Sequence, residues 1–256
     1  MGQNSVTCVR SRWSLLLAMV LVVSIVVAGC GSGSRSLNVF VASSFAKVAQ
    51  QLVAEHVARY PGTEVALNIA GSGTLVTQLQ EGAEADVVIL ASTHHMTTLK
   101  ENGLVSASKV IARNSLAVVT SPRLAGIITS IDEIRDRGFQ IAVCVDSAPC
   151  GALAIAYASA VGLDLSLATR EPNVRAVLAK VERDEVDIGF VYISDVQSSR
   201  VGIGHLASGE GSHYSTSYPL AVAADSNRQQ EARDFVGLFA EEVGQSTLIH
   251  FGFQLP

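Results

Sequence analysis

The feature that most constrains the fold of this chain is a regular alternation of two residue patterns through residues 37–256. Short apolar and β-branched runs, such as LNVFVA at 37–42, are followed by longer stretches, such as 46–60, in which apolar residues recur at helical spacing. The short runs are typical of buried parallel strands, and the longer stretches are typical of helices that cover a sheet. Alternating strands and helices predict an α/β fold with a mostly parallel sheet flanked by helices.

Strands are expected at 37–42, 65–69, 86–90, 115–120, 140–145, 188–192 and 218–224, and helices at 46–60, 74–81, 95–102, 131–137, 152–161, 173–185 and 228–243. Two irregular stretches interrupt this order, residues 107–114 and the polar, Gly- and Ser-rich residues 204–217. Two breaks without a single linker predict that one domain is inserted in another. Lobe 1 is then formed by residues 37–116 and 219–256, and lobe 2 by residues 117–218.

The N-terminus has the layout of an export signal. An uncharged apolar run, LLLAMVLVVSIVVA at 15–28, follows the basic residues Arg10 and Arg12, as in a secretory signal peptide. The run is shorter than the roughly 20 residues that a transmembrane helix needs. We therefore predict a signal peptide at 1–29 and an extracytoplasmic location.

Cys30 directly follows the small residues VAG and precedes GSGSRS. This order resembles a bacterial lipobox, in which the cysteine becomes the lipid-modified first residue of the mature protein. The resemblance implies that Cys30 anchors the protein to the cell membrane and that residues 30–36 form a tether. Several acyl chains anchor a protein stably, whereas a single chain is marginal. The alternative is an ordinary signal peptide or an uncleaved anchor in which Cys30 is incidental.

Cys144 and Cys150 are the other cysteines of the predicted mature chain, because Cys8 leaves with the signal peptide. In an exported protein such a pair can form a disulfide, provided that the two residues come within bonding distance. Alternatively, Cys144 is simply a small apolar residue of a strand. The sequence leaves both interpretations open.

Four loops share one design, in which a strand end is followed by small residues and then by a helix: ASSF at 42–45, AGSGT at 70–74, PCG at 149–151 and EPNVR at 171–175. Ligands of open α/β sheets lie beyond the carboxyl ends of the strands. Helix N-termini offer unpaired N–H groups to an anion, and glycines let the backbone approach it. A serine before a helix is usually only an N-cap, so each loop alone is a weak signal. The recurrence of this design in four loops predicts a binding site in which uncharged hydrogen-bond donors surround an anion.

The order of several motifs resembles the molybdate-binding proteins of bacterial ABC importers. The motifs are VFVASSF, NIAGSGTLVTQLQEGAEADVVILA, RNSLAVVTSP, DSAPCGALA, NVRAVLAKVER, GFVYISDV, YPLAVA and HFGF, which together span residues 37–253. The resemblance implies a two-lobed, periplasmic-binding-protein-like fold of type II, with the ligand in the cleft between the lobes. It also implies that the ligand, molybdate or tungstate, is held by Ser hydroxyls, backbone amides and a Tyr hydroxyl, without a counter-charge.

Transferred residue by residue, the resemblance assigns the family's ligand-binding positions to Ser44 (with Ser43 as an adjacent candidate), Ser72, Cys150, Val174 and Tyr192. Cys150 and Val174 are expected to donate their backbone N–H groups. Cys150 stands where the family has an alanine. A backbone donor survives this change, whereas a free thiol beside the anion would crowd it or become oxidised.

The expected ligand accepts hydrogen bonds and donates none, so a cage that contains only donors suits it. A protonated phosphate would place its P–OH against another donor, which disfavours it. Sulfate has the same charge as molybdate and differs mainly in size, so sulfate or another tetrahedral oxyanion is the alternative ligand. No resident cofactor is expected, and molybdenum enters only as the oxyanion.

Other functions lack their signatures. The sequence has no G-x-S-x-G, H-E-x-x-H or C-x-x-C motif for catalysis or metal binding and no Walker A loop, so we expect no enzyme and assign ATP hydrolysis to a partner subunit. The expected partners are an ABC permease with its ATPase, and the protein is expected to act as a monomer. Beyond Cys30 the charge falls from -5 to -7, because Arg10 and Arg12 leave. This acidic body argues against nucleic-acid binding.

Binders of other ligands are weaker alternatives. Ferric binders of this fold class commonly use neighbouring tyrosines, and no two tyrosines are adjacent in this chain. Arg175 could hold the carboxylate of an amino acid, but an Arg at a helix start is more often structural. Asp195 is expected to be a turn or cap residue. The pair His94-His95 is expected to be a solvated turn.

Overall fold

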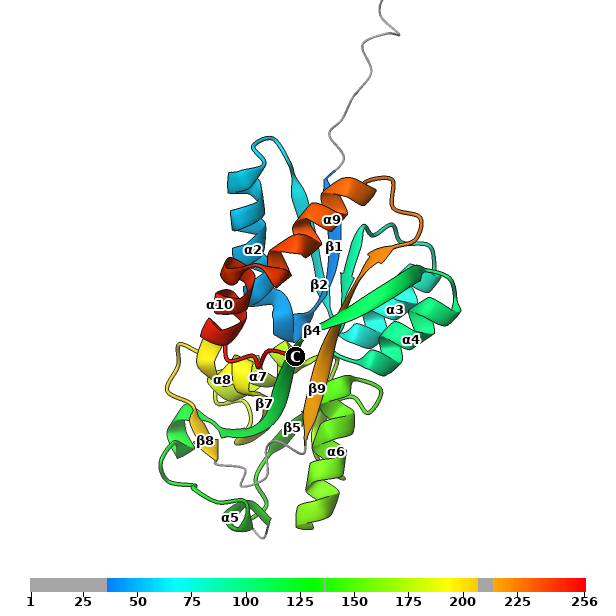
Figure 1. Cartoon of the computed structure of the whole chain (residues 1–256). Helices are drawn as coiled ribbons and strands as arrows, with labels where there is room; N and C mark the ends of the chain where they lie inside the picture. Colours follow the sequence, from blue (N-terminus) through cyan, green and yellow to red (C-terminus); the bar gives the residue numbers. More distant parts are fainter. Residues whose placement is uncertain (1–35, 136, 207–213) are drawn as a thin grey trace, which may run out of the picture. The chain divides into compact units, whose positions relative to one another are not determined.

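One mixed β-sheet runs through the chain, and helices cover both of its faces (Figure 1). The structure is a computed structural model that describes residues 36–135, 137–206 and 214–256, and Ser36–Pro256 form one compact unit. The predicted signal peptide, Cys30 and the tether up to residue 35 lie outside the described residues. No helix among the residues described is long and apolar enough to cross a membrane.

The strands follow the spatial order β2-β1-β3-β9-β4-β7-β5-β6, and β8 pairs with β4. Their bounds are β1 Leu37–Ala42, β2 Val65–Ala70, β3 Val87–Ile89, β4 Val105–Thr120, β5 Ile141–Cys144, β6 Thr169–Glu171, β7 Ile188–Tyr192, β8 Gly204–Leu206 and β9 Ser215–Ala223. Strands β2, β1 and β3 are parallel, as are β7, β5 and β6. Between these groups, β9 and β4 run antiparallel to their neighbours. The α/β class is therefore confirmed, and the centre of the sheet is antiparallel.

The helices are η1 Ser43–Phe45, α2 Ala46–Arg59, α3 Ser72–Gln80, α4 Thr93–Glu101, η2 Pro122–Leu124, α5 Asp132–Arg135, α6 Pro149–Val161, α7 Val174–Glu182, α8 Ile193–Ser198, α9 Gln229–Gly237, η3 Leu238–Ala240 and α10 Glu242–His250. Most predicted elements coincide with observed ones within a few residues. The short elements β6, α8 and β8 were not predicted, because three to six residues carry too little periodicity to detect.

Successive residues of the strands face opposite sides of the sheet, so each side has its own core. In the part formed by β1, β2, β3 and β9, one face packs against α2, α9 and α10, and the other packs against α3 and α4 (Figure 1). In the part formed by β5 and β7, α6 covers one face and α7 covers the other. The helices that precede and follow each strand are thereby fixed relative to the strand ends.

Strand β4 is much longer than predicted. Residues 107–114, expected to be irregular, belong to a strand of 16 residues whose first part pairs with β9 and whose last part pairs with β7. Residues 106–109 are exposed, and the register with β9 shifts twice, so this stretch lacks a regular apolar pattern. The predicted lobe boundaries at 116/117 and 218/219 fall inside β4 and β9, the two strands that continue from one part of the sheet to the other. The division into two lobes stays a prediction.

The prediction of one terminal helix at 228–243 is wrong. The structure contains α9, the short 3-10 helix η3 and then α10, with Glu241 in an extended conformation before α10. Leu238 and Phe239 are buried in η3, and α10 folds back so closely that a Cβ on Gly244 would lie 2.1 Å from the carbonyl oxygen of Leu238. The folded-back arrangement is what buries both apolar side chains.

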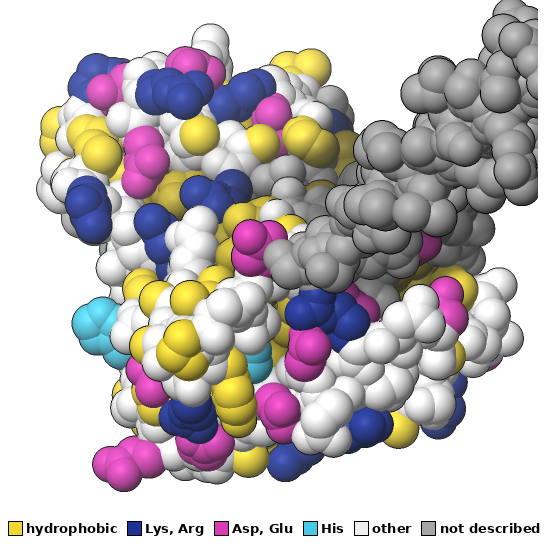
Figure 2. Space-filling model, turned by 90° about the horizontal axis from the view of Figure 1, so that it is seen from above, with side chains coloured by type: hydrophobic (Ala, Val, Ile, Leu, Met, Phe, Trp, Pro, Cys, Tyr) yellow, Lys and Arg dark blue, Asp and Glu magenta, His cyan; other side chains and the backbone are white. Residues whose placement is uncertain are grey.

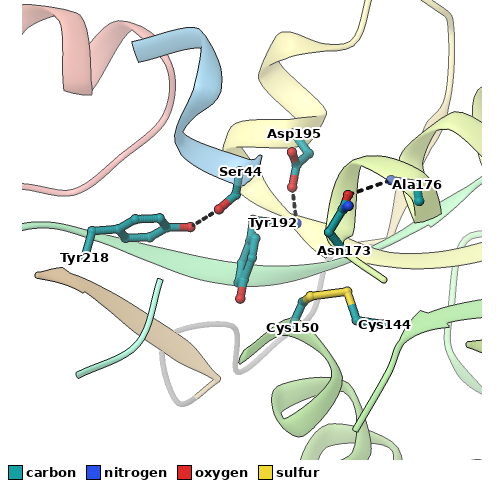
Figure 3. The surroundings of a disulfide bond; sticks show 8 residues. All are labelled: Ser44, Cys144, Cys150, Asn173, Ala176, Tyr192, Asp195 and Tyr218. Atoms are coloured by element: carbon teal, nitrogen blue, oxygen red, sulfur yellow. Dashed lines mark hydrogen bonds between the residues drawn. A yellow bond between two sulfur atoms is a disulfide. The ribbon is translucent and has the colours of Figure 1, made fainter. Parts of the chain in front are cut away.

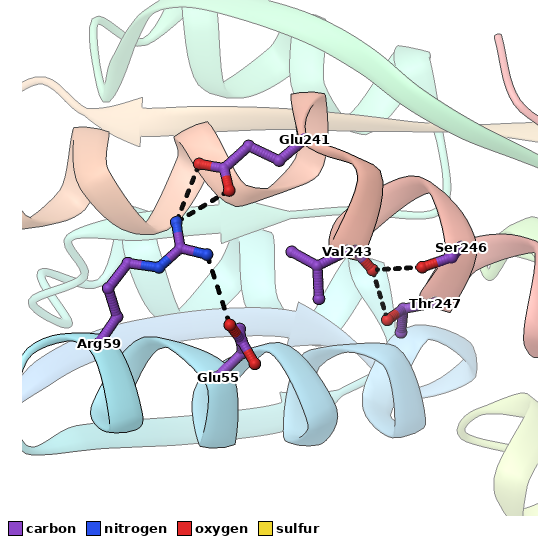
Figure 4. A network of polar contacts seen from close by, with 6 residues as sticks. All are labelled: Glu55, Arg59, Glu241, Val243, Ser246 and Thr247. Atoms are coloured by element: carbon purple, nitrogen blue, oxygen red, sulfur yellow. Dashed lines mark hydrogen bonds and ion pairs between the residues drawn. The ribbon is translucent and has the colours of Figure 1, made fainter.

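Arg59 links α2 to the start of α10 (Figure 4). Its Nη1 atom lies 3.0 and 2.8 Å from the two carboxylate oxygens of Glu241, and its Nη2 atom lies 3.4 Å from Glu55 Oε1. All three side chains are at least one-third exposed, and surface ion pairs of this kind contribute about 0–1 kcal/mol. Packing of apolar residues therefore holds α9 and α10 against the sheet and α2. The ion pair of Arg59 with Glu241 adds little stability and helps to orient the start of α10 relative to α2.

His56 makes the fold sensitive to acid. It is 1% exposed on α2 and packs edge-on against Phe235, and within the described part of the chain neither ring nitrogen has a hydrogen-bond partner. Burial lowers the pKa of His56 below its usual value of 6.5, although Asp234 and Glu231 oppose the shift. As the pH falls below 6.5, the unfolded chain therefore binds this proton first, and stability is lost.

We expect protonation of His56 to decrease the free energy of unfolding below pH 6.5 by up to about 1.4 kcal/mol per pH unit, whereas Asp195, whose pKa is raised to about 7, acts in the opposite direction. His56→Leu should make the decrease shallower, whereas His250→Gln, at an exposed position, should not. Urea unfolding of the three proteins between pH 5 and 7.5 measures this. An unchanged slope in His56→Leu would assign the acid sensitivity to other groups.

Candidate functional site

The four loops singled out in the sequence meet at one small cavity. It has a volume of about 10 Å³ and is lined by Ala42, Ser43, Ser44, Gly71, Ser72, Ala91, Ala148, Pro149, Cys150, Asn173, Val174 and Tyr192. Pockets for drug-sized ligands measure about 300–1,000 Å³, whereas this volume is close to that of a single water-sized group, so the cavity takes at most a ligand of a few atoms. Its lining comes from the carboxyl ends of strands and the first turns of helices, as expected for an α/β sheet.

Three helices begin at the cavity: α3 at Ser72, α6 at Pro149 and α7 at Val174. The first turn of each helix has N–H groups without a partner inside the helix, and its N-terminus carries a partial positive charge of roughly half a unit. Before α7, the Asn173 side chain accepts the Ala176 N–H at 3.1 Å, which fixes the turn and leaves the preceding N–H groups available (Figure 3).

None of the described residues that line the cavity carries a charged side chain. The neighbouring cation Arg175 is exposed and belongs to a different cavity, which it lines together with Lys47 and Arg200. A ligand in the small cavity would therefore be held by neutral groups and helix termini. Among the described residues there is also no group of three or more His, Cys, Asp or Glu residues that could hold a metal ion.

Ser72 is the first residue of α3 and is 2% exposed. Its Oγ atom accepts the backbone N–H of Ala91 at 2.9 Å. Because the hydroxyl oxygen already receives this proton, the hydroxyl hydrogen of Ser72 remains to be donated elsewhere. Gly71, just before it, lies so close to the loop after β6 that a Cβ would be 2.8 Å from the carbonyl oxygen of Pro172, and glycine permits this contact.

Ser44 lies in η1 and is 9% exposed. Its Oγ atom is 2.7 Å from the hydroxyl oxygen of Tyr218, a fully buried residue of β9 (Figure 3). Behind Tyr218, the side chain of Asn114 contacts both Tyr218 and Ser194. The side chain of Ser44 is therefore fixed by a buried network of hydrogen bonds, whose other members lie on β4, β9 and α8.

Tyr192 ends β7 and is 1% exposed, yet its hydroxyl group has no hydrogen-bond partner among the residues that the structure describes. Burial raises the pKa of Tyr192 well above its usual value, so the group is a neutral phenol. A buried hydroxyl without a partner costs about 1–3 kcal/mol. A ligand that accepts this proton would remove that cost, which makes Tyr192 a group prepared for an acceptor.

Asp195 is the cap residue that the sequence predicted. Its Oδ2 atom accepts the backbone N–H of Tyr192 at 2.9 Å at the start of α8 (Figure 3), and it does not line the cavity. Burial raises the pKa of Asp195 to about 7, against the opposing effects of that N–H and of Arg175. The carboxyl group thus fixes the backbone on which Tyr192 sits.

Cys150 and Cys144 form a disulfide, with their Cα atoms 5.8 Å apart (Figure 3). The bond joins the end of β5 to the first turn of α6. Next to it, Gly151 packs so tightly that a Cβ would lie 2.1 Å from the carbonyl oxygen of Val145. The first turn of α6, with its N–H groups, is therefore fixed in place by both a covalent bond and a close backbone contact.

The structure places every predicted site residue around the same cavity: Ser43, Ser44, Ser72, Cys150, Val174 and Tyr192. Their role as ligand-binding residues stays a prediction. The sequence analysis missed Tyr218, Asn114 and Ser194, because only the pairing of β4 with β9 and the position of α8 bring them behind Ser44. No local pattern in the sequence marks these three residues as polar and buried.

Comparison with known proteins identifies the family of the chain. The family described as "Bacterial extracellular solute-binding protein" matches residues 37–254. The chain belongs to this family. A relative named "Molybdate-binding protein ModA" from Mycobacterium tuberculosis is 31% identical over 230 residues, which cover 90% of this chain and 88% of that protein.

Solved structures support the fold of this solute-binding protein. The periplasmic molybdate-binding protein of Azotobacter vinelandii has a TM-score of 0.78 at 18% identity and covers 86% of this chain and 100% of its own. The sulfate-binding protein SubI of Mycobacterium tuberculosis has a TM-score of 0.69 at 17% identity, covering 86% and 87%. At these identities the similarity establishes the shared architecture, a sheet flanked by helices.

The disulfide yields a stability prediction for this solute-binding protein. Closing the short loop from Cys144 to Cys150 should stabilise the fold by about 2 kcal/mol through loss of chain entropy in the unfolded state. We expect the double variant Cys144→Ala/Cys150→Ala to unfold at lower urea concentration than the parent by this amount. Adding dithiothreitol should destabilise the parent and leave the double variant unchanged. Equal sensitivity of both proteins to reductant would contradict the prediction.

Proposed function

We propose that this protein captures molybdate, and also tungstate, outside the cytoplasm and delivers it to an ABC permease that works with an ATPase subunit. It acts as a monomer without a resident cofactor and without catalysing a reaction. The observation that carries the proposal is a cavity of a few atoms' size whose polar groups are neutral donors at helix N-termini. The molybdate specificity comes from the named relative, which is aligned with 90% of the chain.

The proposed ligand contacts are the hydroxyls of Ser44, Ser72 and Tyr192 and the backbone N–H groups of Cys150 and Val174. A hydrogen bond to a charged group contributes about 1.5–3 kcal/mol. Five such bonds supply the roughly 10–11 kcal/mol of a site with a dissociation constant of tens of nanomolar, after the costs of binding and closure are subtracted. Ser43 lines the same cavity and is the secondary candidate.

Recognition is expected to be local rather than steered over long distances. The net charge is -5, and positive and negative side chains are interspersed on the face in Figure 2. An acidic protein offers an anion no long-range attraction. Selectivity therefore depends on the cavity: its donors disfavour a protonated phosphate, and its size separates molybdate from sulfate, whose bonds are shorter.

The proposed contacts come from both parts of the sheet. Ser44 and Ser72 follow β1 and β2, whereas Cys150 and Val174 follow β5 and β6, and Tyr192 ends β7. A ligand that touches both sets favours the conformation in which they are close together. We propose that β4 and β9, which connect the two parts, carry the hinge, and that the permease recognises the closed form.

Calorimetric titration of the purified protein with molybdate, tungstate, sulfate and phosphate tests the proposal. We expect tight one-to-one binding of the first two anions only. Ser72→Ala and Tyr192→Phe should each weaken molybdate binding tenfold or more, about 1.4 kcal/mol, because each removes one donor. Matched controls are Ser106→Ala, at an exposed position of β4, and Tyr157→Phe, on α6 away from the cavity.

Each outcome has a defined meaning. Binding of sulfate at least as tight as that of molybdate would move the protein to the sulfate class. Absence of binding by all four anions would mean that the loops serve only as helix caps. Unchanged affinity in Ser72→Ala or Tyr192→Phe would remove that residue from the proposed contacts.

We further propose that Cys30 carries the lipid that tethers the protein to the cell membrane. Support comes from the sequence alone: a basic start, an apolar run and the VAG-Cys30 junction. In cells, Cys30→Ser should move the protein from the membrane fraction to the soluble fraction or the medium and abolish incorporation of radiolabelled palmitate. Cys8→Ser, within the predicted signal peptide, is the control and should change neither. Palmitate incorporation that persists in Cys30→Ser would exclude this cysteine as the anchor.

A further inference from the structure

The hydroxyl pair formed by Ser44 and Tyr218 has two opposite arrangements of its protons. The oxygen atoms are 2.7 Å apart, and either could be the donor. If Ser44 donates to Tyr218, it presents only lone pairs to the cavity, which repel an anion. If Tyr218 donates to Ser44, the proton of Ser44 is available to the ligand. The surroundings of Tyr218 decide between these arrangements.

The orientation of the Asn114 amide is fixed first. Its Oδ1 atom lies 3.4 Å from the backbone nitrogen of Ser194, which can only donate, so the oxygen must face that nitrogen. Its Nδ2 atom then faces the hydroxyl groups of Ser194 at 2.7 Å and of Tyr218 at 3.5 Å. An amide NH₂ donates and cannot accept.

Tyr218 therefore has one acceptor for its proton. It is 0% exposed, and the hydrogen-bond partners of its hydroxyl among the described residues are Ser44 and the NH₂ group of Asn114. Since Asn114 cannot accept there, a Tyr218 proton that did not go to Ser44 would be buried without a partner, at a cost of about 1–3 kcal/mol. Tyr218 thus donates to Ser44, and Ser44 keeps its own proton for the cavity.

Ser72 has the same arrangement by a simpler route. A backbone N–H, that of Ala91, donates to Ser72 Oγ at 2.9 Å, and a backbone N–H cannot reverse its direction. Ser44 and Ser72 therefore each accept a hydrogen bond from another group of the protein. Ser44 accepts its hydrogen bond from the Tyr218 hydroxyl, which in turn accepts one from the NH₂ group of Asn114. We call this chain of hydrogen bonds the relay.

We propose that Tyr218 and Asn114 are positioning residues that fix the direction of the Ser44 proton, so that Ser44 acts as a donor to the bound oxyanion. Neither residue lines the cavity, so both act through Ser44. This inference rests on the proposed function. It also assigns a reason for a tyrosine and an asparagine that are fully buried in a mainly apolar core.

A double-mutant cycle with molybdate tests the proposal by titration calorimetry. Tyr218→Phe should weaken binding about tenfold, about 1.4 kcal/mol, in the parent. In the Ser44→Ala background the same change should leave the affinity unchanged within twofold, because the hydroxyl through which Tyr218 acts is gone. Tyr157→Phe, another buried tyrosine, is the matched control and should have no effect in either background. The thermal midpoint of each variant is measured in parallel.

Asn114→Asp provides a second route if Tyr218→Phe does not fold. An aspartate oxygen in place of the NH₂ group accepts the Tyr218 proton and reverses the relay, so molybdate binding should weaken by more than tenfold. Direct repulsion by the new charge would persist in the Ser44→Ala background, whereas an effect through Ser44 would largely disappear there. The cycle therefore separates the two causes.

Two results would overturn the proposal: an equal loss of affinity in both backgrounds, which indicates a purely structural role, or no loss in the parent. A parent protein that binds none of the four anions would instead refute the proposed function, and with it the ligand that the relay serves. The parent titration thus distinguishes failure of the function from failure of the relay.

Discussion

Three helices of this chain begin at one small cavity, and each brings backbone N–H groups that no carbonyl of its own helix can reach. Buried donors cost free energy unless an acceptor satisfies them. The hydroxyl of Tyr192, which has no partner among the described residues, is one more buried donor of this kind. The rest of the site follows from this excess of donors. Small residues line the cavity, no charged side chain among its described lining residues supplies an acceptor, and Gly71 lets two loops approach until little space remains.

The same constraint explains why polar residues lie deep in the core behind the cavity. Asn114, Tyr218 and Ser194 are each at most 2% exposed, and partly satisfied polar networks are unfavourable in such surroundings. Their hydrogen bonds connect β4, β9 and α8 with Ser44. The strands that continue from one part of the sheet to the other thereby also determine how Ser44 is oriented. Support of this kind, from a fixed second layer, keeps binding groups in place.

Sequence patterns were sufficient where a residue's environment is determined locally. The loops ASSF and AGSGT follow one group of parallel strands, and PCG and EPNVR follow another, and the carboxyl ends of parallel strands lie together at one edge of a sheet. The pairing of Ser44 with Ser72 and of Cys150 with Val174 could therefore be predicted from these patterns, whereas the meeting of the two pairs and the assignment of Tyr192 came from the resemblance to molybdate-binding proteins. Residues 107–114 could not, because a strand that is exposed up to residue 109 and shifts its register twice has no apolar period, and its partner β9 is distant in sequence. The misplaced end of the helix at 228–243 arises from the tertiary contact of Gly244 with Leu238.

Cys150 shows how a departure from the expected pattern fits the same constraint. A free thiol in this loop would face a cavity prepared for an anion, whereas the bond to Cys144 directs the sulfur toward the end of β5. Cys150 lines the cavity, and the disulfide fixes the turn that carries it. The first turn of α3 is fixed by the Ala91–Ser72 hydrogen bond and that of α7 by Asn173. All three helix starts are thus immobilised by different chemistry, and a rigid donor arrangement can select an oxyanion by its size.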